Sequence, residues 1–355
     1  MTTTTIIIAI LAAFCITYIA VPVSIKIAHR IGAIDKPNNR KVHENLMPRL
    51  GGLAIFLGFI ITMLFVVDVT GPIIGILLGA SLIFIIGLLD DIYRLSAVVK
   101  LIGQIIAAGI AIYFGVIVSF VTNPFDGMLN LGYLSIPLTL LWIVGITNAL
   151  NLIDGLDGLA GGVAGIAACT MGVVALTQGQ LIVALAAFIL VAAILGFLPY
   201  NFHPAKTFMG DGGSNFLGFV LACLAIMGLA KSAAIISLFI PIVILGIPIF
   251  DTFFAIIRRI NNKTHIFKPD KAHLHHRLMI MGLSHKGSVL VIYAISGFFG
   301  ATAITLSFIN SPNASLILAL LLLIIVLGAE KIGMVKGDTQ TTKQQTETRD
   351  IHVNS

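Results

Sequence analysis

Long apolar stretches separated by short polar segments dominate the pattern of the chain. Each stretch approaches the roughly 20 apolar residues that a helix needs to cross a lipid bilayer. Eleven stretches are predicted as membrane spans: 5–25, 50–68, 72–89, 101–120, 134–150, 159–177, 181–198, 215–230, 233–257, 288–309 and 314–330. The segments between them contain glycine, proline and asparagine, which are typical of turns. The pattern therefore predicts an all-α, polytopic integral membrane protein.

The composition supports this prediction, because 58% of the residues are hydrophobic and only 10% are charged. Soluble domains contain about 25% charged residues, so a chain this apolar cannot cover itself with a polar surface. We expect residues 1–335 to form one transmembrane domain and the polar residues 336–355 to form a disordered cytoplasmic tail. The spacing of Gly158 and Gly162 is compatible with close helix packing, either within the chain or in a homodimer.

Basic residues predict the orientation, because cytoplasmic loops of membrane proteins are enriched in lysine and arginine. With the N-terminus outside, 20 of the 21 lysines and arginines fall on the cytoplasmic side, and Lys231 is the exception. An odd number of spans then places the C-terminus in the cytoplasm. The net charge of +6 is one-sided and suits anionic lipid headgroups. Nucleic acid is not an expected partner, because no compact basic domain carries this charge.

Five cytoplasmic loops are expected to form the active site: 26–49, 90–100, 151–158, 199–214 and 258–287. They hold the carboxylates Asp90, Asp91, Asp154, Asp157 and Asp211. Asp154 and Asp157 stand three residues apart, which on a helix would place them on one face. Like charges beside a membrane require a compensating cation, and oxygen ligands without thiols suit Mg²⁺ or Mn²⁺. For either pair alone, an ordinary solvated acid at the membrane surface is an equally good interpretation.

Two further segments suit anionic ligands. Met209–Asn215 (MGDGGSN) predicts a glycine-rich turn before a helix that Ser214 caps, and backbone N–H groups there can hold a phosphate. Residues 265–278 (HIFKPDKAHLHHRL) combine histidines with basic residues, a composition that suits phosphate oxygens better than zinc. The alternatives are an ordinary glycine turn and a basic amphipathic stretch on the bilayer. The first loop, which holds Arg40, is explained equally well by the positive-inside rule.

Carboxylates for a metal and basic loops for anions, placed beside lipid, favour one chemistry. They indicate phosphoryl transfer between a charged cytosolic donor and a phosphate in the inner leaflet. The alternative from another class is a secondary transporter that uses the acids as a coupling-ion site. Transporter sites lie near the midplane and often within inverted repeats, a symmetry that this sequence does not show. A non-catalytic lipid-binding scaffold is a third interpretation.

Six segments, in this order along the chain, resemble the polyprenyl-phosphate N-acetylhexosamine-1-phosphate transferases: PNNRKVHENLMPRLGG, LLDDIYRLS, WIVGITNALNLIDGLDGLAGG, YNFHPAKTFMGDGGSNFLG, IPIFDTFFAIIRR and KAHLHHRL. The resemblance implies transfer of GlcNAc-1-phosphate from UDP-GlcNAc to undecaprenyl phosphate in a bacterial cell membrane, with release of UMP. It is strongest to the branch that begins the wall teichoic acid linkage unit. The branches that initiate O-antigen and transfer phospho-MurNAc-pentapeptide are the alternatives.

The resemblance also implies roles for individual residues. It assigns catalysis to Asp90, Asp91, Asp154 and Asp157, and a Mg²⁺ site, with Mn²⁺ as an alternative ion, to Asp211, Asp90 and Asp91. The residues expected to bind substrate are Asn148, Asn151, Lys100, Arg40, His273, His275, His276 and Arg277.

Overall fold

The computed structural model describes residues 2–35, 46–122, 128–229, 239–264, 272–309 and 311–334. The helices among them are α1 (Thr3–Ile31), α2 (Gly51–Val66), α3 (Gly71–Tyr93), α4 (Ala97–Tyr113), α5 (Ser135–Leu152), α6 (Leu159–Thr177), α7 (Leu181–Asn201), α8 (Gly210–Leu229), α9 (Phe239–Ile244), α10 (Gly246–Asn261), α11 (Leu274–Ile280), α12 (His285–Phe308) and α13 (Ser311–Ile332). Two short antiparallel pairs join β1 (Ile34–Asp35) to β2 (Met47–Pro48) and β3 (Phe120–Thr122) to β4 (Met128–Asn130). The described chain is almost entirely helical, as the hydropathy pattern predicts.

Eight of these helices are long and apolar enough to cross a membrane: α1, α3, α5 with the turn before it, α6, α7, α8, α12 and α13. The shorter apolar helices α2 and α4 coincide with two further predicted spans, 50–68 and 101–120. The predicted span 233–257 begins outside the described residues and continues as α9 and α10, which are separated at Leu245. The protein is therefore an all-α, polytopic membrane protein.

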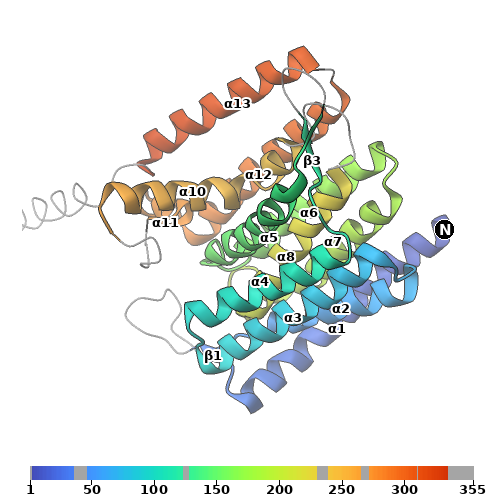
Figure 1. The fold of residues 1–355 in the computed structure, drawn as a ribbon. Helices are drawn as coiled ribbons and strands as arrows, with labels where there is room; N and C mark the ends of the chain where they lie inside the picture. The colour runs from blue at the N-terminus through green and yellow to red at the C-terminus, as the bar shows by residue number, and fades with distance from the viewer. Residues whose placement is uncertain are drawn as a thin grey trace, which may run out of the picture.

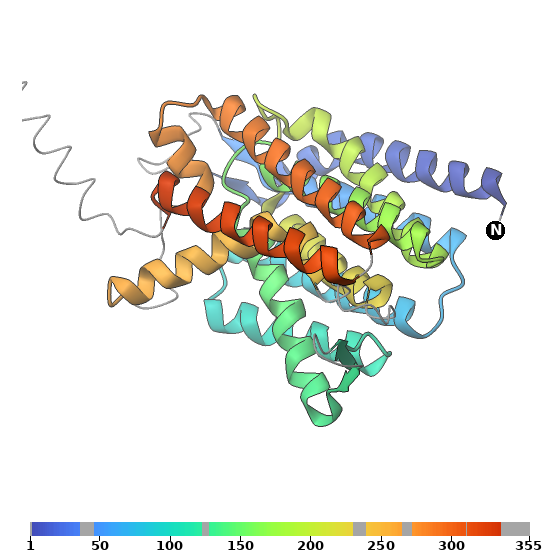
Figure 2. The same ribbon diagram turned by 90° about the horizontal axis from the view of Figure 1, so that it is seen from above.

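Helix α8 lies at the centre of the bundle. Within its apolar window 89% of the residues are buried, against 11% in α13. It packs against α2, α3, α5 and α6. Figure 1 shows α13 set apart along one side of the bundle, and Figure 2 looks down on the same helix. The first turn of α8 is consequently enclosed by several elements, whereas α13 exposes most of its apolar surface.

Polar residues mark where several helices begin. The hydroxyl groups of Ser96 and Ser284 each accept a hydrogen bond from the backbone N–H three residues later, at Val99 and Gly287. Such caps satisfy N–H groups that have no partner within the helix. The segments that follow α3, α5 and α7 lie at the end of the bundle opposite the N-terminus of the chain (Figure 1). This end collects the predicted site residues.

Glycines allow α3 and α8 to approach closely at this end. A Cβ atom added at Gly87 of α3 would lie 2.5 Å from the Cα atom of Gly212 in α8. No side chain fits in that space without separating the two backbones, since real Cβ atoms do not approach other atoms so closely. The absence of a side chain at both positions therefore sets the distance between the ends of these helices.

Gly162 of α6 serves a similar purpose against α12. A Cβ atom there would overlap the ring of Tyr293, whose hydroxyl donates a hydrogen bond to the carbonyl oxygen of Gly158. The predicted close packing at Gly158 and Gly162 is therefore made within the chain.

Replacing Gly87 by alanine tests the contact between α3 and α8. The added methyl group should force the helices apart and lower the free energy of unfolding by about 1–3 kcal/mol, as overpacking does elsewhere. Gly109→Ala is the matched control, because nothing lies within 4 Å of a Cβ at that position of α4, and alanine favours a helix over glycine. Thermal unfolding of the purified proteins measures both. Equal melting temperatures for the two variants would contradict the packing argument.

Candidate active site

Three carboxylates meet where the end of α3 contacts the start of α8. Asp90 and Asp91 lie in the last turn of α3, and Asp211 is the second residue of α8. Asp91 accepts hydrogen bonds from the backbone N–H groups of Asp211, at 3.0 Å, and of Gly212, at 3.1 Å. These N–H groups belong to the first turn of a helix and have no partner within it. Asp91 therefore caps α8 from a neighbouring helix.

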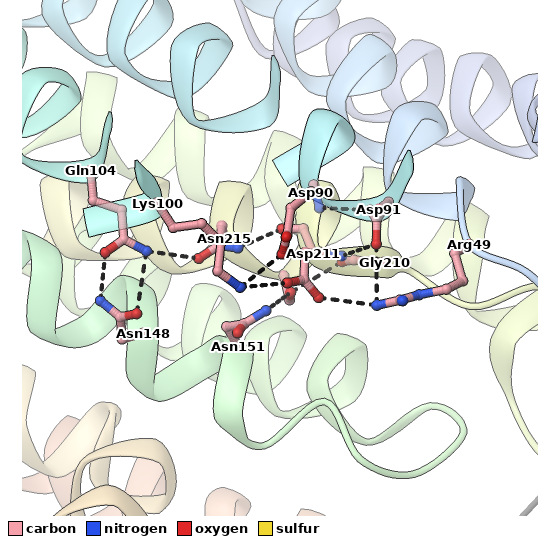
Figure 3. A network of polar contacts seen from close by, with 12 residues as sticks. Arg49, Asp90, Asp91, Lys100, Gln104, Asn148, Asn151, Gly210, Asp211 and Asn215 are labelled. Carbon is pink, nitrogen blue, oxygen red and sulfur yellow. Dashed lines mark hydrogen bonds and ion pairs between the residues drawn. The ribbon is translucent and has the colours of Figure 1, made fainter. Parts of the chain in front are cut away.

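Two cations hold the carboxylates together (Figure 3). The Nη2 atom of Arg49 lies 3.2 Å from a carboxylate oxygen of both Asp91 and Asp211. The Nζ atom of Lys100 lies 2.7 Å from Asp90 and 3.2 Å from Asp211. Asp211 is thus bound by both cations and links the two pairs. Three carboxylates facing two cations leave a surplus of negative charge.

A second layer of the site consists of neutral amides. Gln104 exchanges two hydrogen bonds with Asn148, of 3.3 and 2.7 Å, and donates a third, of 3.2 Å, to Asn215. Asn215 in turn donates to the backbone carbonyl of Asp211, at 2.7 Å. Figure 3 shows this chain of amides running from α5 through α4 to α8. It orients the first turn of α8 without adding charge.

Ser214 does not cap α8, contrary to the prediction. Helix α8 already begins at Gly210, whose φ of +77° places it in the left-handed region. Ser214 therefore lies inside the helix, where its hydroxyl donates to the carbonyl of Gly210 at 3.1 Å and accepts from Asn151 at 2.8 Å. The capping function belongs to Asp91.

The prediction that Asp154 and Asp157 share one face of a helix is also wrong. Helix α5 ends at Leu152 and α6 begins at Leu159, so both aspartates lie in the turn between them. Gly158, with a φ of +78°, makes this turn possible. The turn sends the two side chains into different surroundings.

Asp154 interacts electrostatically with Asp211 of the carboxylate cluster. Burial, together with the negative charge of Asp211, raises the pKa of Asp154 to about 7. Its carboxyl group can consequently take up or release a proton near neutral pH. Asp157 instead accepts hydrogen bonds from the Nδ1 atom of His203, at 2.8 Å, and from the backbone N–H of Ala205, at 3.1 Å.

The histidine segment is anchored by Asp251, which lies in α10. The Asp251 carboxylate binds the Nδ1 atom of His273 at 2.7 Å and accepts the N–H of Leu274 at 2.8 Å. His275 follows in α11 and packs against the turn after α5, because a Cβ atom added at Gly155 would lie 2.5 Å from its Nε2 atom. Burial lowers the pKa of His275 to about 3, with a smaller contribution from His276 beside it. His275 is therefore neutral at physiological pH.

The structure thus brings most of the predicted residues to one end of the bundle. Asp90, Asp91, Lys100 and Asp211 share direct contacts, and Asp154 is close enough for the charge of Asp211 to raise its pKa. Asn148 and Asn151 join the cluster through amide and hydroxyl bonds. His276 and Arg277 lie in α11 with His275. Arg40 lies outside the described residues.

Three residues of the cluster were not predicted as part of it. Arg49 ends the loop 26–49, which was expected to contribute to the active site, but it was not singled out as a site residue. Gln104 and Asn215 carry no charge at all. Helical spacing is the signal that would have found the amides. Gln104 follows Lys100 by four residues and Asn215 follows Asp211 by four, so each pair shares one helix face.

The donor set of the cluster fits a hard divalent cation. All of its acidic groups offer oxygen, the ligand type that Mg²⁺ and Mn²⁺ prefer. A divalent cation would neutralise the surplus negative charge. Asp211 already shares Arg49 with Asp91 and Lys100 with Asp90, so the carboxylates lie close together. Asp211, Asp90 and Asp91 are accordingly suited to hold the ion.

Fold and site together define a polytopic membrane protein with an acidic, cation-stabilised site at one end of a helix bundle. Comparison with known proteins gives the family. Residues 73–229 match the model of glycosyl transferase family 4. The chain is 47% identical over 332 residues, 93% of each chain, to the probable undecaprenyl-phosphate N-acetylglucosaminyl 1-phosphate transferase of Bacillus subtilis.

Two further relatives are more distant. The decaprenyl-phosphate N-acetylglucosaminephosphotransferase of Mycobacterium tuberculosis is 36% identical over 87% of this chain and 84% of its own. The undecaprenyl-phosphate alpha-N-acetylglucosaminyl 1-phosphate transferase of Escherichia coli is 29% identical over 75% of this chain and 74% of its own. The chain therefore belongs to the polyprenyl-phosphate N-acetylhexosamine-1-phosphate transferases of glycosyl transferase family 4, and the resemblance seen in the sequence is confirmed.

The two neighbouring aspartates should differ in their effect on stability. Asp91→Ala should lower the free energy of unfolding by about 1–3 kcal/mol, because it leaves two backbone N–H groups of α8 without a partner in a buried position. Asp90→Ala removes one of the two carboxylate partners of Lys100, leaves Asp211 as the other and leaves the cap intact, so it should cost less. Thermal unfolding in detergent compares them. A melting temperature that falls as far in Asp90→Ala as in Asp91→Ala would contradict the capping role.

Proposed function

We propose that the protein transfers GlcNAc-1-phosphate from UDP-GlcNAc to undecaprenyl phosphate and releases UMP. The observation that carries this proposal is the 47% identity to the Bacillus subtilis relative across 93% of both chains. The described site supports it, because carboxylates and cations gather at one end of a membrane-embedded bundle. A charged sugar nucleotide and a lipid-borne phosphate can meet at such a place.

In the proposed reaction, an oxygen of undecaprenyl phosphate attacks the sugar-bearing phosphorus of UDP-GlcNAc. A new phosphorus–oxygen bond forms as the bond to the bridging oxygen of the UMP part breaks, so one diphosphate linkage replaces another. The step is near isoergic, and catalysis consists mainly of positioning and charge neutralisation. A carboxylate that titrates near neutral pH, as Asp154 does, is suited to accept a proton from the acceptor phosphate.

Mg²⁺ is the proposed cofactor, with Mn²⁺ as an alternative, and Asp211, Asp90 and Asp91 are its proposed ligands. When bound, such an ion would neutralise the donor diphosphate. Lys100 lies 3.2 Å from Asp211, and its ammonium group is suited to bind phosphate oxygens of the substrates beside the proposed metal ligands. Arg49 likewise lies 3.2 Å from the other carboxylate oxygen of Asp211.

Further residues are proposed to contact the substrates. They are Asn148, Asn151, Arg40, His273, His275, His276 and Arg277, with Asp157 as a further catalytic residue. Asn148 and Asn151 are supported by their hydrogen bonds to Gln104 and Ser214, and His275 is supported by its contact with Gly155, beside Asp154. Because His275 is neutral, its ring would act as a hydrogen-bonding group and not as a positive charge.

The proposed topology has eleven spans, with the N-terminus outside and the active site on the cytoplasmic face of a bacterial cell membrane. The transmembrane domain covers residues 1–335, and residues 336–355 form a polar tail. The distribution of lysine and arginine supports this orientation. Within cell-wall polysaccharide synthesis, we assign the protein to the first membrane step of wall teichoic acid formation.

Metal dependence is tested with Asp211→Asn. Membranes containing the wild-type protein should form lipid diphosphate and UMP only when Mg²⁺ or Mn²⁺ is added. Asp211→Asn should lower this rate at least about hundredfold, because it removes the carboxylate shared by both cations in an electrostatically organised site. Asp68→Asn is the matched control, since Asp68 is exposed in the turn between α2 and α3. Full activity of Asp211→Asn would remove Asp211 from the metal site.

A panel of donors tests the proposed substrate. UDP-GlcNAc, UDP-GalNAc and UDP-MurNAc-pentapeptide are supplied separately with undecaprenyl phosphate, and release of UMP is measured. UDP-GlcNAc should give the highest kcat/KM. A preference for the pentapeptide donor would move the protein to the other branch of the family, and uptake of substrate without UMP release would favour a transporter.

A further inference from the structure

A second cluster of metal-ligating side chains lies outside the carboxylate cluster. It comprises Asp157 in the turn after α5, His203 in the segment between α7 and α8, and His285 at the start of α12. Each offers one ligand atom, and the three atoms lie within 4.8 Å of one another. Three segments that are distant in the sequence thus bring two imidazole rings and one carboxylate to one point.

Two of the three ligand atoms are already in direct contact. The Nδ1 atom of His203 donates a hydrogen bond to a carboxylate oxygen of Asp157 at 2.8 Å. If Nδ1 gives up this proton, its lone pair points at the same oxygen, so a cation can take the place of the proton. With metal–ligand bonds of about 2.0–2.2 Å, tetrahedral ligands stand about 3.4 Å from each other. Replacing the proton by a metal therefore requires only a small outward movement, which the exposed His203 side chain can make.

His285 completes the set. Its ring stacks on that of His203, with centroids 4.4 Å apart, and its Nε2 atom accepts the backbone N–H of Asp157 at 2.9 Å. Its Nδ1 atom is buried and makes no hydrogen bond to the part of the chain that the structure describes. One hydrogen bond therefore holds the polar edge of this ring, and a metal that takes the Nε2 lone pair has only that bond to replace.

Two backbone hydrogen bonds hold Asp157 and the residue after it in place. The N–H of Ala205 donates to the same carboxylate oxygen at 3.1 Å, and the amide oxygen of Asn201 accepts the N–H of Gly158 at 3.1 Å. Hydrogen bonds of this kind orient the ligands of metal sites. The carboxylate is therefore held in place before any ion arrives.

We propose that Asp157, His203 and His285 form a site for a borderline divalent metal ion such as Zn²⁺ or Co²⁺, separate from the oxygen-rich site of Asp90, Asp91 and Asp211. Two imidazole nitrogens with one carboxylate suit such ions, whereas Mg²⁺ prefers oxygen ligands and retains its water. Three protein ligands would leave one position of a tetrahedral ion for water or another ligand. Occupancy would tie together the turn before α6, the segment before α8 and the first residue of α12.

Co²⁺ is the probe, because its visible absorption becomes intense when it binds with low coordination number. The full-length protein in detergent is titrated with Co²⁺ in the presence of excess Mg²⁺, which occupies oxygen-rich sites. One equivalent should give a saturable absorption band that Zn²⁺ abolishes. Melting temperature should rise with Zn²⁺, since a ligand that binds the folded state stabilises it.

The variant His203→Gln should weaken Co²⁺ binding at least about tenfold, because even the loss of an outer hydrogen-bonding partner costs this much in other metal sites. His203 is exposed, so the variant should fold. His29→Gln, which removes an exposed imidazole from the end of α1, is the matched control and should bind as the wild type does. The same affinity in His203→Gln, which would place the metal at other side chains, or no saturable band in the wild type, would overturn the proposal.

Discussion

The bond between Asp91 and the first turn of α8 is the constraint on which the rest of the site depends. Asp91 accepts two backbone N–H groups that helix geometry leaves without a partner. The bond forms because Gly87 and Gly212 let the two backbones approach closely. It fixes the position of Asp211 relative to the end of α3, and with it every contact that Asp211 makes. The close glycine contact between α3 and α8 and the capping of α8 by Asp91 therefore belong to the same arrangement.

Once the carboxylates are held together, their charge must be balanced. Arg49 and Lys100 do this from two different segments, and Asp211 binds both. Neither cation belongs to α3 or α8, so the chain segments before α2 and at the start of α4 are drawn to the same place. The amides of Gln104 and Asn215 extend the network into the bundle without adding charge. A charged site can therefore sit at the end of an apolar core without a carboxylate being left unpaired at its centre.

The fold was largely predictable because hydropathy determines membrane helices more strongly than any local preference does. The candidate aspartates were also found, since topology alone places them at one end of the bundle. What the sequence did not reveal depended on backbone geometry and neutral groups. The chain leaves helix α5 at Leu152, before Asp154 and Asp157, so these two residues do not share a helix face. The early start of α8 at Gly210 puts Ser214 inside the helix. Gln104 gives no charge signal within an apolar helix.

The neutrality of His275 has a consequence for how the protein responds to its surroundings. Its ring is buried against the turn after α5, and its pKa of about 3 lies far below neutral pH. The buried Asp154 in the same turn has a pKa of about 7. Acidification from neutral pH to about pH 5 therefore changes the charge of the carboxyl group but leaves the imidazole ring beside it uncharged.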